Sequence, residues 1–448
     1  MPNIWAVNGG VWVGYATETN RGEPSHGRKY PIYYADDRHI LTFGPNGSGK
    51  TRRALRKNLL DTTGWSALII DPKGELARDT GAAREAGAKD QGGEVFYLDP
   101  YGITKRPPSD FNPLLSLDAS NENFVDDAMR LAEAIVTIEG KEPHWSHSAQ
   151  DLVSACIMYG VLSGNATLRE IRANLGKTST DFRKLIGDMR LIGVKKDWDE
   201  LTVKASRFLE IDPANKELHS ILSTALTQTR WIDSRAIKRH TNEGMIPFKD
   251  MKKKPITVYL ILPANRLVTQ NKWLRLVITC CIQALMEDAN PGSVPVLLAL
   301  EEAAAIGHLP IIEDTMALMR GYGIKLWSIF QDVNQLEDIY HRRWESFIAN
   351  AGVLQAFAPR DTKTAKFLSD LAGQKTVEVE NEGLGWGLQG LSLKGLSSSG
   401  NTSKNKMAVP DILPQELMRM DMGYTALFSH KTKGISFAYL PDPSESDG

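Results

Sequence analysis

The chain has 448 residues, of which 42% are hydrophobic and 24% are charged, an ordinary globular composition with room for two or three domains. The formal net charge of −1 excludes a basic field over the whole surface, so contact with nucleic acid needs a local patch or the lining of a pore. The sequence shows no secretory signal and no run of about 18 apolar residues, so it predicts neither export nor a membrane-spanning helix.

A glycine-rich segment near the N-terminus joins a predicted strand to a predicted helix. His39–Phe43 is apolar and leads directly into the pattern GxxxxGKT, which is the spacing of a phosphate-binding loop. The glycines allow a tight turn whose N–H groups point at phosphates, while Lys50 can reach the β- and γ-phosphates and Thr51 can ligate Mg²⁺. We therefore predict a nucleoside triphosphate site formed by Gly44, Pro45, Asn46, Gly47, Ser48, Gly49, Lys50 and Thr51.

Short apolar runs with β-branched or aromatic residues recur along the chain. Most of them are apolar on both faces, as parallel strands covered by helices are, and helical patterns separate several of them. This alternation predicts a doubly wound α/β fold with a mainly parallel sheet. The predicted strands are His39–Phe43, Ala67–Ile70, Val95–Leu98, Ile256–Leu262, Val294–Leu300, Ile324–Phe330 and Val353–Phe357.

The alternation stops between Leu98 and Ile256, and helical spacing replaces it. The stretch is far too long for one connection between strands. We therefore predict an all-α domain at 116–245, inserted between two parts of the nucleotide-binding domain, 1–115 and 246–441. The predicted helices of this stretch are Asn121–Glu139, Gln150–Leu162, Asp181–Ile192 and Leu218–Ile232.

The C-terminal part combines a Gly- and Ser-rich stretch with a last strand pair. Residues 382–408 predict a long surface loop that is functional or partly disordered. We predict a terminal β-hairpin formed by Tyr424–Ser429 and Gly434–Leu440. We also predict that the acidic residues 442–448 form a disordered tail.

Two acidic residues follow the predicted strand Val294–Leu300, at the end of the strand where ligands bind in open α/β sheets. In phosphate-loop sites the first acid orients the Mg²⁺ shell and the second activates water. We therefore predict that Glu301 and Thr51 bind the metal and that Glu302 is the general base. Glu301 stands where an aspartate is usual, and its side chain is one methylene longer. Either a water accommodates the extra length, or the longer side chain weakens metal binding. The alternative interpretation is that both acids have no role in catalysis and only stabilise the start of a helix through its dipole.

Three further residues complete the predicted catalytic set. Gln331 follows the strand Ile324–Phe330, and an amide there can sense the γ-phosphate or position water. Arg320 and Arg360 lie near strand ends, and in ring ATPases an arginine from the neighbouring subunit often stabilises the transition-state charge. Either arginine fits that role, and either is also an ordinary surface or structural residue. The predicted catalytic residues are thus Lys50, Glu302, Gln331, Arg320 and Arg360.

Together these residues resemble the coupling proteins of type IV secretion and conjugation, ATPases related to the HerA–FtsK translocases. The most specific motif is Asp71–Glu75, which by itself would be only a strand-to-helix turn with a capping aspartate. The resemblance covers nearly the whole chain in the expected order. The other matching segments are Gly44–Thr51, Phe111–Leu114, Glu301–Glu302, Gly307–Pro310, Arg320–Gly323, Gln331, Asp361–Ala365, Leu368–Val377 and Leu413–Leu417.

The resemblance implies a RecA-like P-loop domain that binds ATP and Mg²⁺, an all-α domain near the entrance of a central channel, and a homo-oligomeric ring, expected to be a hexamer. It implies ATP-driven delivery of single-stranded DNA with its relaxase, or of protein effectors, to the components of a secretion channel. Members of the family usually carry an N-terminal membrane anchor, and this sequence begins close to the motor without one. The expectation is a cytoplasmic protein that meets the inner membrane face only through a partner.

Two other interpretations stay open at this point. One is a substrate-receptor module that binds nucleotide but hydrolyses it weakly, which Glu301 in place of aspartate would favour. The other is a soluble DNA translocase or helicase of the wider HerA–FtsK group, for which a pore would need only a few charges per subunit. The sequence does not distinguish DNA from protein as the cargo.

Overall fold

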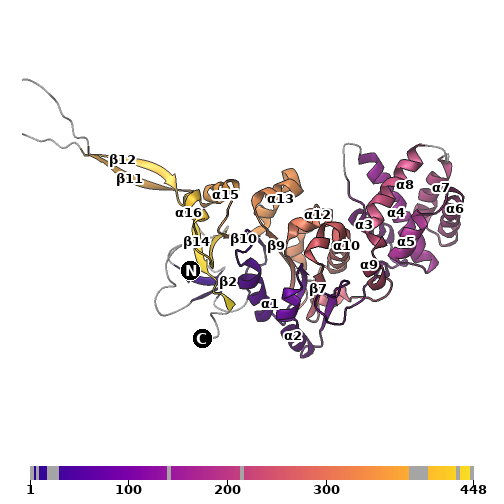
Figure 1. Cartoon of the computed structure of the whole chain (residues 1–448), viewed down its shortest axis with the longest axis horizontal. Helices are drawn as coiled ribbons and strands as arrows, with labels where there is room; N and C mark the ends of the chain where they lie inside the picture. The colour runs from indigo at the N-terminus through magenta and orange to yellow at the C-terminus, as the bar shows by residue number, and fades with distance from the viewer. Residues whose placement is uncertain are drawn as a thin grey trace, which may run out of the picture.

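The fold is built on one long mixed β-sheet with helices on both faces (Figure 1). The computed structural model describes residues 5–6, 10–17, 30–138, 143–211, 216–382, 402–429 and 434–443. Within them, the strand order of the sheet is β1-β3-β2-β14-β13-β10-β4-β9-β8-β5-β7-β6, and β11 and β12 form a separate two-stranded ribbon.

Parallel strands form the centre of the sheet, and each of the predicted runs is one of them. Neighbouring strands in this part are all paired in parallel, so their carboxyl ends share one edge of the sheet. The prediction of a mainly parallel sheet is therefore confirmed, with shifts of one or two residues at the strand ends. In spatial order the strands are β10 (Ala351–Phe357), β4 (His39–Phe43), β9 (Ile324–Phe330), β8 (Val296–Leu300), β5 (Ser66–Asp71), β7 (Ile256–Ile261) and β6 (Glu94–Leu98).

Alternate residues of the central strands pack into two separate cores. In β5, Leu68 and Ile70 belong to the larger core, and Ala67 and Ile69 belong to the smaller one. Helices α1 and α2 cover the smaller core, while the remaining helices around the sheet pack against the larger core. Because both faces are covered, the strands are mainly apolar, and the polar residues that they carry, such as His39 and Lys325, are buried. These helices are α1 (Arg56–Asp61), α2 (Glu75–Lys89), α10 (Leu267–Met286), α11 (Ala303–Ile306), α12 (Pro310–Met319), α13 (Val333–Tyr340), α14 (Glu345–Asn350), α15 (Thr362–Ala372) and α16 (Pro414–Met418).

An antiparallel extension continues the sheet beyond β10. The predicted C-terminal hairpin is confirmed as β13 (Tyr424–Ser429) paired with β14 (Ile435–Tyr439), although residues 430–433 lie outside the described residues. N-terminal strands that the sequence did not predict then follow β14 in the sheet, because β2 pairs with β14. They are β2 (Val11–Thr17), β3 (Pro31–Tyr34) and β1 (Trp5–Ala6).

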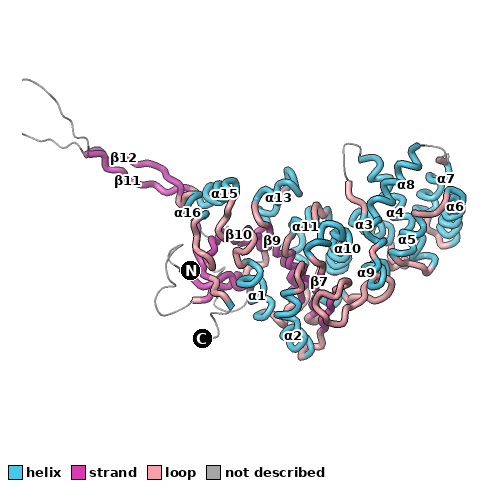
Figure 2. The backbone as a smooth tube through the Cα atoms, viewed as in Figure 1, coloured by secondary structure: helices cyan, strands magenta, loops and turns pink. Residues whose placement is uncertain are grey.

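A group of helices without strands lies at one end of the molecule, on the right in Figure 2. Buried Arg275 of α10 attaches this group to the sheet, because it donates to the carbonyl oxygens of Ala134 at 2.9 Å and of His308. Within the described ranges, no helix combines the length and the apolar character needed to cross a bilayer. The helices of this group are α3 (Phe124–Ile135), α4 (Pro143–Ser163), α5 (Leu168–Leu175), α6 (Ser179–Lys195), α7 (Asp199–Glu210), α8 (Lys216–Thr229) and α9 (Arg235–His240).

Two sequence predictions near the C-terminus need correction. Residues 402–408 are not loop, because β12 (Thr402–Pro410) pairs antiparallel with β11 (Gln374–Glu382) along its whole length. The ribbon projects from the sheet (Figure 1), and residues 374–377, whose exposure the structure describes, are exposed, so burial imposes no apolar pattern on that part of its sequence. The tail prediction is wrong for Asp442, which forms ion pairs with two arginines. Residues 383–401 and 444–448 lie outside the described residues.

Candidate functional site

The phosphate-binding loop lies between the end of β4 and the helical turn Lys50–Leu55 (η1). Gly47 and Gly49 have φ angles of +78° and +88°, a region that side chains disfavour. A Cβ atom on Gly49 would also lie 2.7 Å from Cδ of Arg53, so that side chain would have to move. The glycines therefore set the shape of the loop that precedes η1.

The two acids that follow β8 face the last two residues of the loop. Nζ of Lys50 lies 3.9 Å from Oε1 of Glu302, and the Thr51 hydroxyl donates to Oε1 of Glu301. Strand β9 separates β4 from β8 in the sheet, so these contacts cross the carboxyl end of the intervening strand. The structure thus brings together the predicted metal-binding pair, and it places the predicted base beside the lysine.

Gln331 also belongs to this group. It follows β9, and its Nε2 donates to Oε2 of Glu302 over 3.2 Å. Glu302 itself has a φ angle of +55°, which residues other than glycine rarely adopt and which is often found at functional sites. Glu302 is therefore oriented by Lys50 on one carboxylate oxygen and by Gln331 on the other.

Two carboxyl groups at this edge have raised pKa values. Burial raises the pKa of Glu301 to about 7, although the hydrogen bond from Thr51 opposes the shift. Burial also raises the pKa of Asp71 to about 6, although backbone N–H groups, including that of Ala77 at 2.8 Å, oppose it. A cation between these oxygens would favour their ionised forms.

The donor set fits Mg²⁺ bound together with a nucleotide. Thr51 and Glu301 offer the hard oxygen ligands that Mg²⁺ prefers. In the part of the chain that the structure describes, no cluster of three or more His, Cys, Asp or Glu residues could hold a metal by itself. Mg²⁺ usually takes one or two protein ligands and completes its shell with water and phosphate oxygens, so the two residues are sufficient.

A cavity of about 700 Å³ joins these groups. Its volume lies within the range of small-molecule sites. It brings together the loop, the Asp71–Glu75 motif, the acids after β8 and two residues of the C-terminal region. The lining residues are Asn46, Gly47, Gly49, Lys50, Thr51, Arg52, Arg53, Asp71, Pro72, Lys73, Glu75, Ala264, Leu267, Glu301, Glu302, Ala305, Met422 and Asp442.

The sequence had assigned no site role to several of these lining residues. Lys73 and Glu75 belong to the motif after β5, and that position after a parallel strand was a usable signal. Met422 and Asp442 had no local signal, because only the pairing of β14 with β13 and β2 brings the C-terminal region to the loop.

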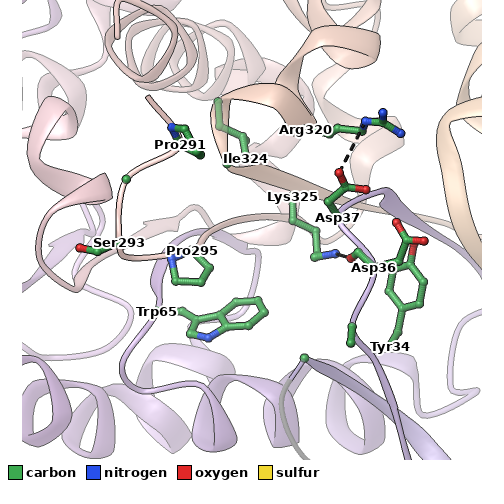
Figure 3. A pocket seen from close by; sticks show the side chains of 14 residues that line it. Tyr34, Asp36, Asp37, Trp65, Pro291, Ser293, Pro295, Arg320, Ile324 and Lys325 are labelled. Atoms are coloured by element: carbon green, nitrogen blue, oxygen red, sulfur yellow. Dashed lines mark hydrogen bonds and ion pairs between the residues drawn. The ribbon is translucent and has the colours of Figure 1, made fainter. Parts of the chain in front are cut away.

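Arg320 lies at the opposite edge of the sheet from the loop. It precedes β9 whereas Gln331 follows that strand, so the two ends are roughly 20 Å apart at the usual rise per residue. Figure 3 shows Arg320 beside a cavity of about 340 Å³ that Trp65 and Lys325 also line. Its Nε lies 3.6 Å from a carboxylate oxygen of Asp37. Arg320 does not meet the phosphate-binding loop of its own chain.

Arg360 lies at the same edge of the sheet as the loop. It follows β10, the neighbour of β4, and its side chain is exposed. It does not line the cavity that contains Lys50. Neither predicted arginine therefore lines the cavity that contains the phosphate-binding loop of its own chain.

The loop, the acids after β8 and the covered parallel sheet define a P-loop nucleotide-binding protein. The chain belongs to the family described as Type IV secretory system Conjugative DNA transfer, whose profile matches residues 8–436. It is similar to a conjugal transfer protein TraG of Escherichia coli, with 27% identity over 390 residues, 83% of this chain and 59% of that protein. It is also similar to the protein VirD4 of Agrobacterium fabrum, with 26% identity over 352 residues, 77% of this chain and 50% of that protein. The matched part of the chain thus spans 59% of the length of the first relative and half the length of the second.

The fold is similar to that of the bacterial conjugative coupling protein TrwB. An unbound structure of TrwB matches with a TM-score of 0.67 at 16% identity, over 92% of this chain and 87% of that one. TrwB has also been solved with a non-hydrolysable ATP analogue, with a GTP analogue, and with ADP and Mg²⁺, at TM-scores of 0.64, 0.64 and 0.65. The prediction of a RecA-like P-loop fold is confirmed.

Proposed function

We propose that this chain binds ATP with Mg²⁺ in the cavity beside η1 and hydrolyses the ATP. The observation that carries the proposal is the position of Glu302, whose carboxylate lies 3.9 Å from Nζ of the phosphate-binding Lys50 and accepts a hydrogen bond from Gln331. The nucleotides bound to the related TrwB support ATP and Mg²⁺ as ligands. A carboxylate oriented in this way can accept the proton of an attacking water.

Each residue of the group then has a separate task. Lys50 pairs with the β- and γ-phosphate oxygens, and Thr51 and Glu301 hold the Mg²⁺. When bound, this ion neutralises charge that develops on the phosphate oxygens. Glu302 is the general base, and Gln331 keeps its carboxylate in place and senses the γ-phosphate.

We further propose that hydrolysis drives a homo-oligomeric ring, a hexamer, that delivers DNA with its relaxase, or protein effectors, to a type IV secretion channel. Membership of the conjugative DNA transfer family supports this role, as does the similarity to TraG and VirD4 proteins. The helices α3–α9 form the all-α domain, 116–245, that receives the cargo in this proposal. The protein acts in the cytoplasm, and a channel component brings it to the inner membrane face.

A second function, a nucleotide-binding receptor that turns ATP over weakly, is favoured by one observation. Burial raises the pKa of Glu301 to about 7, so this carboxyl is partly protonated at neutral pH before a cation binds. Metal binding then has to release a proton, and a weak site would leave ATP bound but slowly hydrolysed.

Binding and turnover of ATP by purified protein test the proposal. Lys50→Ala should abolish ATP binding, because it removes the cation that pairs with the phosphates. Glu302→Gln should keep ATP affinity within about threefold and lower kcat by two orders of magnitude or more, as expected for loss of a general base. Equal turnover by Glu302→Gln and the wild type would contradict the assignment of the base. Turnover that is weak in the wild type, with or without single-stranded DNA, would favour the receptor instead.

A further inference from the structure

A second cavity, of about 770 Å³, lies between the group of helices α3–α9 and the helices that cover the sheet. Residues of α3 and α4 line one side of it, and residues of α10, α11 and α12 line the other. Helix α11 packs against α10, and α10 packs against α3 (Figure 2). The volume of this second cavity lies within the range of ligand-binding sites.

Only adjacent residues separate the second cavity from the nucleotide cavity. In α11, Ala305 lines the nucleotide cavity and Ile306 lines the second cavity. At the start of α10, Leu267 and Val268 are divided in the same way. Helix α11 begins directly after Glu302, and the backbone N–H of Ala305 donates to the carbonyl oxygen of Glu302 over 2.8 Å. A ligand in the second cavity would therefore contact the helix that follows the proposed general base.

The lysine and the arginine that line the second cavity already have partners. The guanidinium of Arg275 donates to three backbone carbonyl oxygens, and Nζ of Lys272 donates to the Thr137 hydroxyl over 3.5 Å. Buried or half-buried cations need such partners, so these contacts fix the two side chains in place. Among the lining residues that the structure describes, no unpaired lysine or arginine is left for a phosphate, which counts against a nucleic acid as the ligand.

A carboxylate of the same cavity has no such partner. Glu133 of α3 is half-buried, and within the described residues its carboxylate forms neither a hydrogen bond nor an ion pair. Burial raises the pKa of Glu133, and the negative charge of Asp314 adds to the shift, although Arg130 opposes it. Asp314 lines the same cavity, and its ion pair with Arg343 at 3.7 Å joins two exposed side chains and is weak. A cation bound beside Glu133 would stabilise its ionised form.

Aliphatic side chains from both sides of the cavity accompany this carboxylate. Val268 of α10 is 79% exposed, and Ile138, which follows α3, is 54% exposed. Val136 and Ile306 continue the apolar lining and are themselves buried. Exposed aliphatic groups that gather at one cavity mark a surface that a partner covers. A ligand that covers them and also pairs with Glu133 combines aliphatic groups with a cation, as a peptide does that has leucine, isoleucine or valine beside lysine or arginine.

We propose that the second cavity binds a peptide segment of a partner protein, with an aliphatic side chain next to a lysine or an arginine, and that this peptide acts on the nucleotide site through α11. The cation pairs with Glu133, and the aliphatic group covers Val268 and Ile138. Contact with Ile306 shifts α11 and with it Glu302. Such coupling is reciprocal, so ATP changes the affinity for the peptide as much as the peptide changes the affinity for ATP. Peptide binding goes beyond the proposed function, and only the coupling rests on it.

Binding of labelled synthetic peptides to the full chain tests the site. The probe is Gly-Leu-Lys-Leu-Gly with blocked ends, the comparison peptide has glutamate in place of lysine, and fluorescence anisotropy gives both Kd values. The wild type should bind the lysine peptide about tenfold or more tightly, as expected for a hydrogen bond between charged groups. Glu133→Gln should bind both peptides within about twofold of each other. Glu170→Gln is the matched control, because Glu170 is also half-buried but lies in α5, outside the cavity, and it should keep the preference.

Two further measurements test the apolar contact and the coupling. Val268→Ser should weaken both peptides by the same factor, because it removes an exposed aliphatic group that either peptide covers. A saturating non-hydrolysable ATP analogue should change the Kd of the lysine peptide by about fivefold or more, and saturating peptide should change the Kd of the analogue by the same factor. Neither measurement depends on turnover.

The possible results separate this inference from the proposed function. A wild type without affinity for ATP contradicts the proposed function, while the preference for the lysine peptide is still measured. A wild type that binds ATP but binds neither peptide, or binds both equally well, overturns the peptide site. Displacement of the lysine peptide by a single-stranded DNA oligonucleotide would assign the cavity to nucleic acid instead. A preference that persists in Glu133→Gln would overturn the role of Glu133, and a peptide Kd that the ATP analogue leaves unchanged would overturn the coupling.

Discussion

Gln331 and Glu302 follow two different strands and meet through one hydrogen bond, in which Nε2 of Gln331 lies 3.2 Å from Oε2 of Glu302. Strands β8 and β9 are parallel neighbours, so the residues just beyond their carboxyl ends face each other. Lys50 approaches the other carboxylate oxygen at 3.9 Å. The proposed general base is thus oriented from two sides, and each contact can be removed separately.

Removal of the Gln331 amide should slow hydrolysis more than it weakens binding. In Gln331→Ala, Glu302 keeps its contact with Lys50 but can rotate, so we expect kcat to fall about tenfold or more while the Kd for ATP stays within about threefold. Gln331→Glu should be slower still, because it places a second negative charge beside the base. Steady-state turnover and equilibrium ATP binding measure the two effects.

Gln335→Ala is the matched control for this prediction. The Gln335 side chain accepts a hydrogen bond from the backbone N–H of Gln331 at 2.9 Å, but it does not contact Glu302. We expect a smaller loss of turnover in this variant than in Gln331→Ala. A Gln331→Ala variant that keeps wild-type kcat would show that the hydrogen bond has no part in catalysis.

Shortening Glu301 should weaken the metal site. The carboxylate of Glu301 already reaches the Thr51 hydroxyl, so Glu301→Asp withdraws it by about one C–C bond, roughly 1.5 Å. We expect the Mg²⁺ concentration at half-maximal turnover to rise several-fold, with no gain in kcat. Titration of turnover with Mg²⁺ at saturating ATP gives both quantities. A more than tenfold gain in kcat would instead indicate a degenerate native site and the receptor function.

Arg320 is our candidate for an arginine that acts in the site of a neighbouring subunit. It lies at the edge of the sheet away from its own loop, and its ion pair with Asp37 joins two half-exposed side chains, which makes that pair weak and easily exchanged. Arg320→Ala and Lys50→Ala should each be inactive as pure proteins. A mixture of the two should recover turnover, because a Lys50→Ala subunit supplies Arg320 to the intact loop of its neighbour.

Arg360 serves as the comparison in the same mixing experiment. It is exposed at the loop edge, and we expect Arg360→Ala to keep most of its activity as a pure protein. An Arg360→Ala variant that is inactive alone and recovers turnover with Lys50→Ala, while Arg320→Ala does not recover, would reverse the assignment. If turnover recovers in neither mixture, neither arginine acts in the site of a neighbouring subunit.

The sequence predicted the parts of the fold that leave a local pattern. The central strands are covered on both faces, so each appears as a short apolar run, and the phosphate-binding loop has a fixed spacing of glycine, lysine and threonine. The sequence did not predict β2 and β3 in the antiparallel part of the sheet, nor the ribbon of β11 and β12 outside it. In β3, three of the four residues are only half-buried, so burial does not impose an apolar sequence there.

The site was predictable only where its residues follow a strand. Glu301, Glu302 and Gln331 each come directly after an apolar run, so their meeting at one edge could be inferred from the parallel sheet. The contact between Arg53 and Asp442 spans 389 positions, and it depends on the order of strands in the antiparallel part of the sheet. Likewise, only the structure shows that Arg320 precedes its strand at the far edge.

His39 should make stability depend on pH independently of the nucleotide site. Its Nε2 lies 2.7 Å from the carbonyl oxygen of Met316, to which it donates, and its Nδ1 accepts from the backbone N–H of Leu326 over 3.1 Å. Both ring nitrogens are thus satisfied in the neutral form. Burial lowers the pKa of His39 to about 4, with the positive charges of Lys325 and Arg320 adding to the shift. The unfolded chain binds the proton from about pH 6.5 downwards.

Between these two pKa values the unfolded state binds more protons than the folded state, so the contribution of His39 to stability is complete above about pH 6.5 and is lost as the pH falls toward 4. Asp71 and Glu301 titrate with the opposite sign, because their folded pKa values are raised, so the wild-type profile alone does not isolate the histidine. We therefore expect the difference in unfolding free energy between the wild type and His39→Gln to shrink by up to about 3 kcal/mol from pH 7 to pH 4. Urea unfolding of both proteins over that range measures the difference. A difference that stays constant with pH would show that His39 is not the titrating group.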